Sequence, residues 1–315
     1  MGQTAFIFPG QGAQLVGMGA DVAQASTRAA EIFTRANEVL GFDLQNACFN
    51  GPAEALEATD IQQPAILVTS IALLAALAER EDPAPLAAAT AGLSLGEYTA
   101  LYFAGSLAFE DAVSLVRRRG QLMQEAADAS AGGMVSLIGA DEAQATELCA
   151  KAAEGEPLVP ANLNCPGQIV ISGSAAACAR ATTLAEEFRL RAVPLKVAGA
   201  FHSPLMQPAA DRLGEVLAKT EIRAPRIPVI SNVTAQAHGA PDSIRELLQK
   251  QVTSAVRWQA CVEHLQAQGC NRFVEVGPNR VLTGLMRKID RKATTVCINS
   301  QEAIEQNELV GAASR

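Results

Sequence analysis

The sequence predicts an α/β fold in which a domain built on a parallel sheet is interrupted by a smaller inserted unit. Two observations support this prediction. Short apolar segments typical of buried strands alternate with helical patterns towards both ends of the chain, which is the order found in parallel α/β sheets. In the middle, the order of elements is β-α-β-β-α-β, the ferredoxin-like unit. A chain of 315 residues is also long enough for two domains.

The first part of the chain predicts two strands and three helices. Thr4–Phe8 is a short apolar run that ends at Pro9 and Gly10, which together favour a tight loop. A second strand of mainly small residues, Leu86–Ala91, runs directly into Gly92. The predicted helices cover residues 28–40 and 65–77, and a third begins near residue 97.

The inserted ferredoxin-like subdomain is predicted at residues 127–198, so that the α/β domain consists of residues 1–126 and 199–315. Strands of the subdomain are expected at 134–138, 158–163, 169–172 and 192–197, and its helices at 141–153 and 175–188. The α/β domain then resumes with a helix at 208–217, a strand at 228–232 and a last strand at 272–275.

Composition excludes several classes of function. With 25 basic and 33 acidic residues the formal net charge is −8, so no overall positive field attracts nucleic acid or anionic lipid. The seven cysteines lack C-x-x-C spacing, so neither a disulfide framework nor a zinc site is expected. The longest apolar stretch, residues 65–78, is shorter than the roughly 20 residues that span a bilayer, and no basic segment of a secretory signal precedes the first apolar run. We therefore expect a cytoplasmic protein, and nothing in the sequence demands more than a monomer.

A candidate nucleophile lies in the segment Gly92-Leu93-Ser94-Leu95-Gly96, which matches G-x-S-x-G between a predicted strand and a predicted helix. Glycines on both sides allow a sharp turn that lifts the Ser94 hydroxyl above the sheet at the start of a helix. Backbone N–H groups at that helix start can stabilise an oxyanion. The pattern alone also fits an ordinary loop serine, but its strand-turn-helix context favours catalysis.

A serine hydroxyl needs a base to remove its proton, and histidine is suited to that role near neutral pH. Of the three histidines, His202 lies in a loop between a predicted strand and a predicted helix, where sites form in such sheets. His238 lies in a polar turn and His264 on a predicted helix, so both fit structural roles better. The sequence therefore favours His202 as the base.

A candidate anion-binding residue is found among Arg117, Arg118 and Arg119. They resemble a solvated run of charge, but helical periodicity separates them. With Val116 and Met123 on the apolar face of the helix, Arg118 points away from the core while Arg119 borders that face. A guanidinium at a buried edge needs an anionic partner, either a ligand carboxylate or a structural Asp or Glu.

The loop Gly10-Gln11-Gly12 invites comparison with nucleotide-binding loops. Leu15, however, occupies the third glycine position of G-x-G-x-x-G, and no G-K-[ST] follows. Dinucleotide and P-loop nucleotide binding are therefore not expected.

Taken together, six segments resemble the bacterial malonyl-CoA:acyl carrier protein transacylases, and the similarity spans nearly the whole chain. The segments are Phe6–Gln14, Gly92–Leu101, Arg118–Glu125, Asn162–Gly173, Gly199–Met206 and Glu275–Leu285. The resemblance implies an α/β-hydrolase-like domain with a ferredoxin-like insertion, in agreement with the layout above. It also implies a function in fatty acid biosynthesis with no bound cofactor or metal, malonyl-CoA and the phosphopantetheine of the carrier protein being the substrates.

The resemblance also implies roles for individual residues. Ser94 is the acylated nucleophile and His202 its general base and acid. The backbone N–H groups of Gln11 and Leu95 form the oxyanion hole. Arg119 holds the free malonyl carboxylate. The backbone carbonyl of Gln251 orients the histidine, in place of an acidic side chain.

Specificity follows from the same resemblance. Phe201, directly before the histidine, is similar to the bulky ring of malonyl-selective relatives, which leaves little room for a branched acyl chain. Two positions differ from the family pattern: Leu93 stands where a histidine is usual, and Ala255 where a proline is common. The first difference bears on how strictly malonyl is preferred.

The expected partner is an acidic acyl carrier protein, which an acidic enzyme must meet with a local cationic patch. Basic charge is concentrated on two segments, at Arg189 and Arg191 and at Arg287 and Lys288, and solvated surface charge is the competing explanation. Three other functions remain open: a serine esterase or thioesterase that releases the acyl group to water, an acyl-binding module without turnover, and an acyltransferase of a polyketide pathway.

Overall fold

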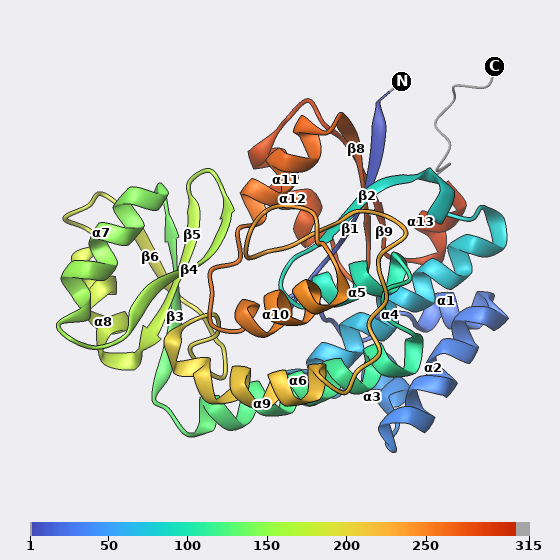
Figure 1. Cartoon of the computed structure of the whole chain (residues 1–315), viewed down its shortest axis with the longest axis horizontal. Helices are drawn as coiled ribbons and strands as arrows, with labels where there is room; N and C mark the ends of the chain where they lie inside the picture. Colours follow the sequence, from blue (N-terminus) through green and yellow to red (C-terminus); the bar gives the residue numbers. More distant parts are fainter. Residues whose placement is uncertain (1, 307–315) are drawn as a thin grey trace.

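The central feature of the fold is a five-stranded parallel sheet in the order β7-β2-β1-β8-β9 (Figure 1). The computed structural model describes residues 2–306 of the chain. The strands are β1 (Gln3–Phe8), β2 (Ala87–Gly92), β7 (Val229–Ile230), β8 (Cys270–Val276) and β9 (Thr294–Ile298). β1 lies between two strands and is covered on both faces, which explains its nearly continuous apolar sequence. The predicted α/β class with a parallel sheet is confirmed.

Helices cover both faces of this sheet. Before β2 the helices are α1 (Ala20–Ala25), α2 (Thr27–Leu40), α3 (Leu44–Asn50) and α4 (Thr59–Arg80), with short 3₁₀ turns at Ala53–Leu56 and Ala84–Leu86. After it come α5 (Gly96–Phe103), α6 (Phe109–Asp128), a 3₁₀ turn at Pro204–Met206, α9 (Gln207–Leu217), α10 (Pro241–Gln251), α11 (Trp258–Ala267), α12 (Val281–Ile289) and α13 (Gln301–Gln306).

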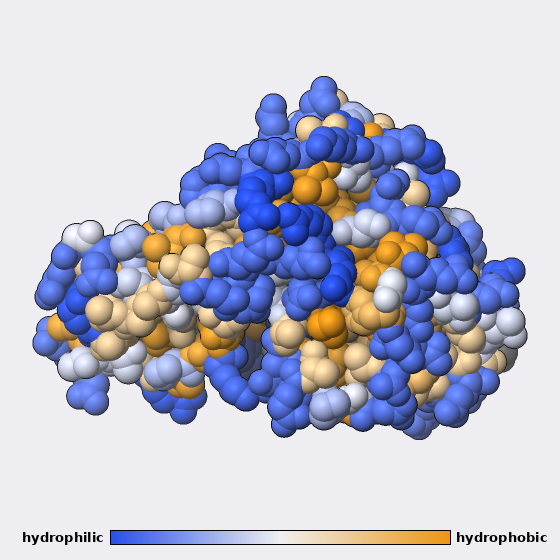
Figure 2. All heavy atoms as spheres, turned by 90° about the horizontal axis from the view of Figure 1, so that it is seen from below, coloured by the Kyte–Doolittle hydropathy of each residue, from blue (hydrophilic) through white to orange (hydrophobic). Residues whose placement is uncertain are grey.

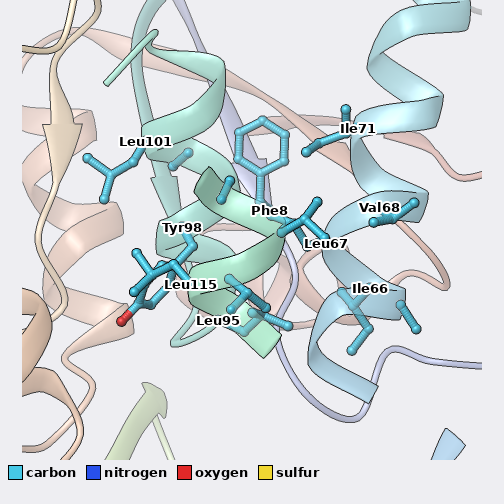
Figure 3. Close-up of a cluster of buried hydrophobic side chains, with 14 of the residues drawn as sticks. Phe8, Ile66, Leu67, Val68, Ile71, Leu95, Tyr98, Leu101 and Leu115 are labelled. Atoms are coloured by element: carbon cyan, nitrogen blue, oxygen red, sulfur yellow. The ribbon is translucent and has the colours of Figure 1, made fainter. Parts of the chain in front are cut away.

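Two hydrophobic cores result from the alternation of side chains along β1. Successive residues of a strand point to opposite faces, so Phe6 and Phe8 belong to one core and Ala5 and Ile7 to the other. The first core contains α2, α4, α5 and α6, and Figure 3 shows Phe8 among side chains of α4 and α5, including Leu67. The second core contains α11 and α12. The sheet thus lies between two helical layers. The carboxyl ends of its strands are not covered by these layers, and this is where sites form in such sheets.

Helix α4 is longer than the sequence predicts, because it begins with the polar residues that precede the expected start at residue 65. Its 22 residues are long and apolar enough to cross a membrane by length and composition alone. Most of the helix is buried inside the protein, however, and it packs against α2 and α6. It is therefore the buried core helix that the sequence predicts.

A separate four-stranded antiparallel sheet, in the order β4-β5-β3-β6, forms the smaller lobe. Its elements are β3 (Gly132–Ile138), α7 (Glu142–Ala153), β4 (Leu158–Cys165), β5 (Gln168–Ser174), α8 (Ala175–Leu184) and β6 (Arg191–Pro194). This sequence of elements and this strand order are those of a ferredoxin-like unit. The predicted unit is confirmed, and the proposed domain boundaries at 127 and 198 stay a prediction.

Two elements of this lobe end earlier than predicted. Helix α8 ends at Leu184 instead of Phe188, because the following residues form 3₁₀-type turns and Arg189 adopts a left-handed conformation with φ of 57°. Strand β6 ends at Pro194, and residues 195–198 leave the sheet to line a cleft described below.

The prediction that the strand at 272–275 is the last one is wrong. β9 follows it and pairs in parallel with β8. β9 is an edge strand with one strand neighbour, and only two of its five residues are buried. It therefore lacks the continuous apolar run by which buried parallel strands are identified.

The small sheet is fastened to the main domain next to the end of α10. The backbone N–H of Leu163 in β4 donates to the carbonyl of Val256 at 2.9 Å, and the N–H of Val256 donates to the carbonyl of Ala161 at 2.8 Å. Both bonds link the edge of one lobe to the loop that follows Gln251 in the other. The two lobes therefore meet beside the candidate site.

Candidate active site

Ser94 lies on the sharp turn between β2 and α5, as the motif predicts. It adopts a left-handed conformation with φ of 52°. A Cβ atom at Gly92 would lie 1.9 Å from the carbonyl carbon of Gly96, and one at Gly96 would lie 2.1 Å from the carbonyl oxygen of Phe8. Both glycines are therefore required by close backbone approach, which holds the serine over the end of the sheet.

His202 is within hydrogen-bond distance of the serine. Its Nε2 lies 2.8 Å from Ser94 Oγ, and its Nδ1 lies 2.8 Å from the backbone carbonyl oxygen of Gln251. Because a carbonyl oxygen only accepts, Nδ1 carries the proton and donates, and Nε2 is free to accept from the serine hydroxyl. Like Ser94, His202 has a positive φ, of 58°.

The imidazole is in its basic form at neutral pH. Burial of the imidazole, together with the positive charge of Arg119, lowers the pKa of His202 to about 4. The side chain is therefore neutral and able to accept the serine proton without first losing one of its own.

Arg119 is fully buried and lies beside the nucleophile, although the sequence places it only at the border of the apolar face. Its Nη1 donates to Gln63 Oε1 at 2.6 Å, and its Nη2 donates to Ser94 Oγ at 3.1 Å and to Gln251 Oε1 at 3.0 Å. The ring of Tyr98 lies 5.3 Å from the guanidinium carbon. Burial lowers the pKa of Arg119.

No carboxylate among residues 2–306 forms an ion pair with Arg119. Its hydrogen-bond acceptors are two amides and a hydroxyl, and its Nε has no acceptor within the described part of the chain. The sequence leaves two alternatives open for the anionic partner of Arg119, a ligand carboxylate or a structural one. Among the described residues, no structural carboxylate is directly paired with it. A buried guanidinium with neutral partners is suited to receive a ligand carboxylate.

Two backbone N–H groups near the serine are available to an oxyanion. Within the described residues, neither the N–H of Gln11 nor that of Leu95 donates a hydrogen bond to the protein. The N–H of Ser94 itself is occupied, because it donates to Asn232 Oδ1 at 2.6 Å. The N–H groups that can bind an oxyanion are therefore those of Gln11 and Leu95, the two that the family resemblance implies.

Ser94 and His202 open into a cleft of about 790 Å³ between the two lobes. Its walls include the loop at Gln11, Phe201, the segment 195–198 and residues of α12. Leu93 also lines the cleft, so the substitution at this position directly affects the polarity of the wall. In Figure 2 the surface is hollowed between the smaller lobe and the main body, and apolar residues are exposed around that junction.

The sequence analysis does not identify three further residues of the site, Gln63, Glu97 and Asn232, or the contact that His238 makes with Glu97. Gln63 accepts a hydrogen bond from Arg119. Asn232 accepts one from the backbone N–H of Ser94. Asn232 was identifiable, because it ends a predicted parallel strand on the side where sites form. His238 lies outside the helices and strands, after a turn; it is buried, and its Nε2 lies 2.7 Å from Glu97 Oε1.

The four basic residues expected to contact a carrier protein, Arg189, Arg191, Arg287 and Lys288, are exposed on the two lobes. Lys288 Nζ donates to Gln168 Oε1 at 2.8 Å, and Gln168 lines the cleft. Within residues 2–306, no group of three or more His, Cys, Asp or Glu side chains could hold a metal ion.

Comparison with known proteins agrees with this geometry. The family model of the acyl transferase domain matches residues 5–315. The malonyl CoA-acyl carrier protein transacylase of Bacillus subtilis is 44% identical over 307 residues, which cover 97% of this chain and 96% of that protein. The Escherichia coli K12 protein of the same name is 43% identical over 96% of this chain and 98% of its own.

Solved structures give the same result. An acyl carrier protein S-malonyltransferase from Vibrio cholerae superposes with a TM-score of 0.92 at 43% identity, covering 96% of this chain and 99% of that one. A type II polyketide malonyl-transacylase in complex with its acyl carrier protein gives 0.93 at 38% identity, covering 96% and 98%. The chain belongs to the acyl transferase family and, within it, to the malonyl CoA-acyl carrier protein transacylases.

Proposed function

We propose that this protein transfers a malonyl group from malonyl-CoA to the phosphopantetheine thiol of an acyl carrier protein in fatty acid biosynthesis, through an ester on Ser94. The observation that carries the proposal is the buried guanidinium of Arg119, which lies 3.1 Å from the nucleophile without an ion-pair partner in the described residues. A serine and a histidine suffice for acyl transfer in general. The guanidinium adds selectivity for an acyl group that ends in a carboxylate.

In the first half of the reaction Ser94 attacks the thioester. The hydroxyl proton passes to Nε2 of His202 at 2.8 Å while Oγ bonds to the carbonyl carbon. The N–H groups of Gln11 and Leu95 stabilise the negative oxygen of the tetrahedral intermediate. The C–S bond then breaks, and the CoA sulfur leaves with the proton from His202.

In the second half the carrier thiol takes the place of CoA. Its proton passes to His202, its sulfur attacks the ester carbonyl, and Oγ of Ser94 leaves and recovers the proton from His202. Every proton that is removed is returned, and only groups of this chain and the two substrates take part. Throughout, the carbonyl of Gln251 keeps Nδ1 protonated and Nε2 available.

Arg119 binds the malonyl carboxylate and thereby positions the acyl chain over Ser94. The two amides that accept from its guanidinium, of Gln63 and Gln251, hold the side chain in place. Phe201, which is buried at the cleft wall, limits the room for a branched acyl group. Leu93 gives that wall an apolar surface at the position where the family pattern described above has a histidine.

An acyl carrier protein is proposed to dock on the basic residues at one end of the small sheet. Arg191 is paired with Ile138, and Ile138 is paired with Gln168, so their side chains share one face about 10 Å apart, or two strand spacings. Lys288 donates to Gln168. The strand register therefore brings Arg189 and Arg191, before and at the start of β6, towards Arg287 and Lys288, at the end of α12. Both pairs lie beside the cleft. The cytoplasmic location and the monomeric state stay predictions.

A second candidate keeps the same chemistry and changes the acceptor. The similarity to a malonyl-transacylase solved with a polyketide carrier protein favours it. Turnover measured with a fatty acid carrier and with a polyketide carrier distinguishes the two. A third candidate, the esterase, requires malonyl-CoA to be hydrolysed as fast with carrier protein as without it.

Replacing Arg119 by Ala is expected to lower the ratio of malonyl to acetyl transfer. Loss of a charge-assisted pair with the carboxylate, at about 3 kcal/mol, lowers kcat/KM for malonyl-CoA about 100-fold, with a smaller effect on acetyl-CoA. Acyl-enzyme formation with each substrate measures the ratio. Arg118→Ala is the matched control, because Arg118 is the partly exposed neighbour of Arg119 and contacts Gln121 and Glu125 instead of the site. An unchanged ratio in Arg119→Ala contradicts the assignment.

The pH dependence of acylation is expected to follow His202. With a pKa of about 4, its basic form persists well below pH 6.5, so kcat/KM for acetyl-CoA should stay level from pH 7 to 5. Arg119→Ala removes a positive neighbour, raises the pKa of His202 and should move the acid limb to higher pH. Acetyl-CoA is used because it has no titrating carboxylate. An acid limb near pH 6.5 in the unaltered protein is incompatible with this account.

The same shift predicts how stability depends on pH. The unfolded state takes up the His202 proton near pH 6.5 and the folded state only near pH 4. Between these values the unfolded state binds more protons, so this residue lowers the free energy of unfolding as the pH falls through that window. Urea unfolding of the protein and of a His202→Gln variant at pH 7 and pH 5 isolates the contribution.

Reversing charge with Arg287→Glu and Lys288→Glu together is expected to raise the KM for carrier protein several-fold, because rim charges act on encounter with an acidic partner. Acylation by malonyl-CoA should be unaffected. Exposed basic residues that do not line the cleft, Arg28 and Lys219, provide the control double variant. Carrier kinetics that match the control remove the docking proposal.

A further inference from the structure

A buried carboxylate lies beneath the nucleophile and takes no direct part in the proposed reaction. Glu97, three residues after Ser94 in α5, has no solvent exposure. Its Oε2 accepts from Gln251 Nε2 at 2.8 Å and from the backbone N–H of Asn232 at 2.9 Å. Its Oε1 accepts from His238 Nε2 at 2.7 Å. Such a carboxylate is expensive to bury, so its hydrogen-bond partners define what it does.

One of these partners, Gln251, joins the carboxylate to Ser94, His202 and Arg119. Its backbone carbonyl accepts from His202 Nδ1 at 2.8 Å, and its side-chain Oε1 accepts from Arg119 Nη2 at 3.0 Å. Its side-chain Nε2 donates to Glu97 and also to the backbone carbonyl of Ser94, at 3.1 Å. The amide group thus has a donor end that faces acceptors and an acceptor end that faces a donor.

The orientation of this amide determines whether it supports or repels the guanidinium. With Oε1 towards Arg119, the amide accepts one of its N–H groups. Turned by 180°, it would present its own N–H groups to the guanidinium and its oxygen to the carboxylate of Glu97, and both contacts would be repulsive. The carboxylate of Glu97 can only accept, so it selects the first orientation.

Resting on the function proposed above, we infer that Glu97 is a positioning residue for carboxylate recognition. By fixing the amide of Gln251, it holds the Arg119 guanidinium where the malonyl carboxylate binds. The influence of Glu97 on the substrate is therefore indirect and depends on the length and hydrogen bonding of its side chain. A second effect, supply of negative charge near a buried guanidinium, is distinguishable from the first by experiment.

Two variants separate geometry from charge. Glu97→Gln keeps the length of the side chain and removes the charge. The amide oxygen of the new side chain can accept from Gln251 and Asn232. Its NH₂ can donate to Nε2 of His238 if the proton of that imidazole moves to Nδ1, which has no hydrogen-bond partner in the described residues. Glu97→Asp keeps the charge and withdraws the carboxylate by one methylene. Positioning predicts that the Asp variant is the more impaired, and charge compensation predicts the reverse.

The measurement is the ratio of kcat/KM for malonyl-CoA to that for acetyl-CoA in acyl-enzyme formation. We expect Glu97→Asp to lower the ratio about tenfold, the effect of one hydrogen bond to a charged group, and Glu97→Gln to keep it within about threefold. A residue that only stabilises the fold would change both substrates in parallel. Equal loss for both substrates in Glu97→Asp, or a larger ratio loss in Glu97→Gln, overturns the inference.

Glu275→Asp is the matched control. Glu275 is equally buried and accepts from the backbone N–H groups of Leu282 and Thr283 at the start of α12, without contact to Arg119. It should lose stability and keep the ratio. If circular dichroism shows that Glu97→Asp does not fold, Gln251→Met replaces it as the test. This variant removes the side-chain acceptor for Arg119 and keeps the backbone carbonyl that accepts from His202. An unchanged malonyl to acetyl ratio in Gln251→Met overturns the inference.

Arg119→Ala, measured in parallel, keeps the two proposals apart. If it lowers the ratio and the Glu97 variants do not, the positioning role fails and the proposed function stands. If Arg119→Ala itself leaves the ratio unchanged, recognition of the carboxylate by this residue fails, and the role of Glu97 fails with it.

Discussion

The site depends on keeping one guanidinium buried next to a serine hydroxyl. Arg119 has no solvent exposure, and its contacts within the described chain are neutral. Removing a charge from water is costly unless hydrogen bonds replace those to solvent. Gln63, Gln251 and Ser94 supply such bonds, and a substrate carboxylate supplies the remaining opposite charge. The same charge helps to keep His202 neutral, so recognition and base strength are coupled through a single residue.

The fold makes this burial possible by bringing distant segments to the carboxyl end of one sheet. Ser94 follows β2, the loop at Gln11 follows β1, and Asn232 follows β7, three strands that are neighbours in the parallel sheet. The small lobe closes the other side of the cleft and is bonded to the loop after α10 at Val256. Because α10 ends at Gln251, the residue that orients the histidine and the residue that attaches the lobe lie close together at the end of the same helix.

Much of this arrangement is predictable from the sequence, and the part that is not has a common cause. The strand-turn-helix motif identifies Ser94, loop position favours His202, and helical periodicity singles out Arg119, because each signal is local. Asn232 contacts Ser94 across 138 positions and Gln251 contacts Glu97 across 154. The end of a strand can mark Asn232 as a site residue, but no local pattern predicts which residue either of them contacts. Likewise β9, half-exposed at the edge of the sheet, lacks the apolar run that reveals β1. Local chemistry identified the reacting groups, and only tertiary structure reveals what holds them.

The central claim is that these groups act on one acyl chain carried by Ser94. The most direct measurement is peptide mass mapping of the protein after brief exposure to malonyl-CoA and acid quench, with a Ser94→Ala variant alongside. The account predicts one malonyl group on the peptide that contains Ser94, absent from the variant, and lost when a carrier protein bearing phosphopantetheine is added before the quench. An adduct on another peptide, or none in the unaltered protein, contradicts it.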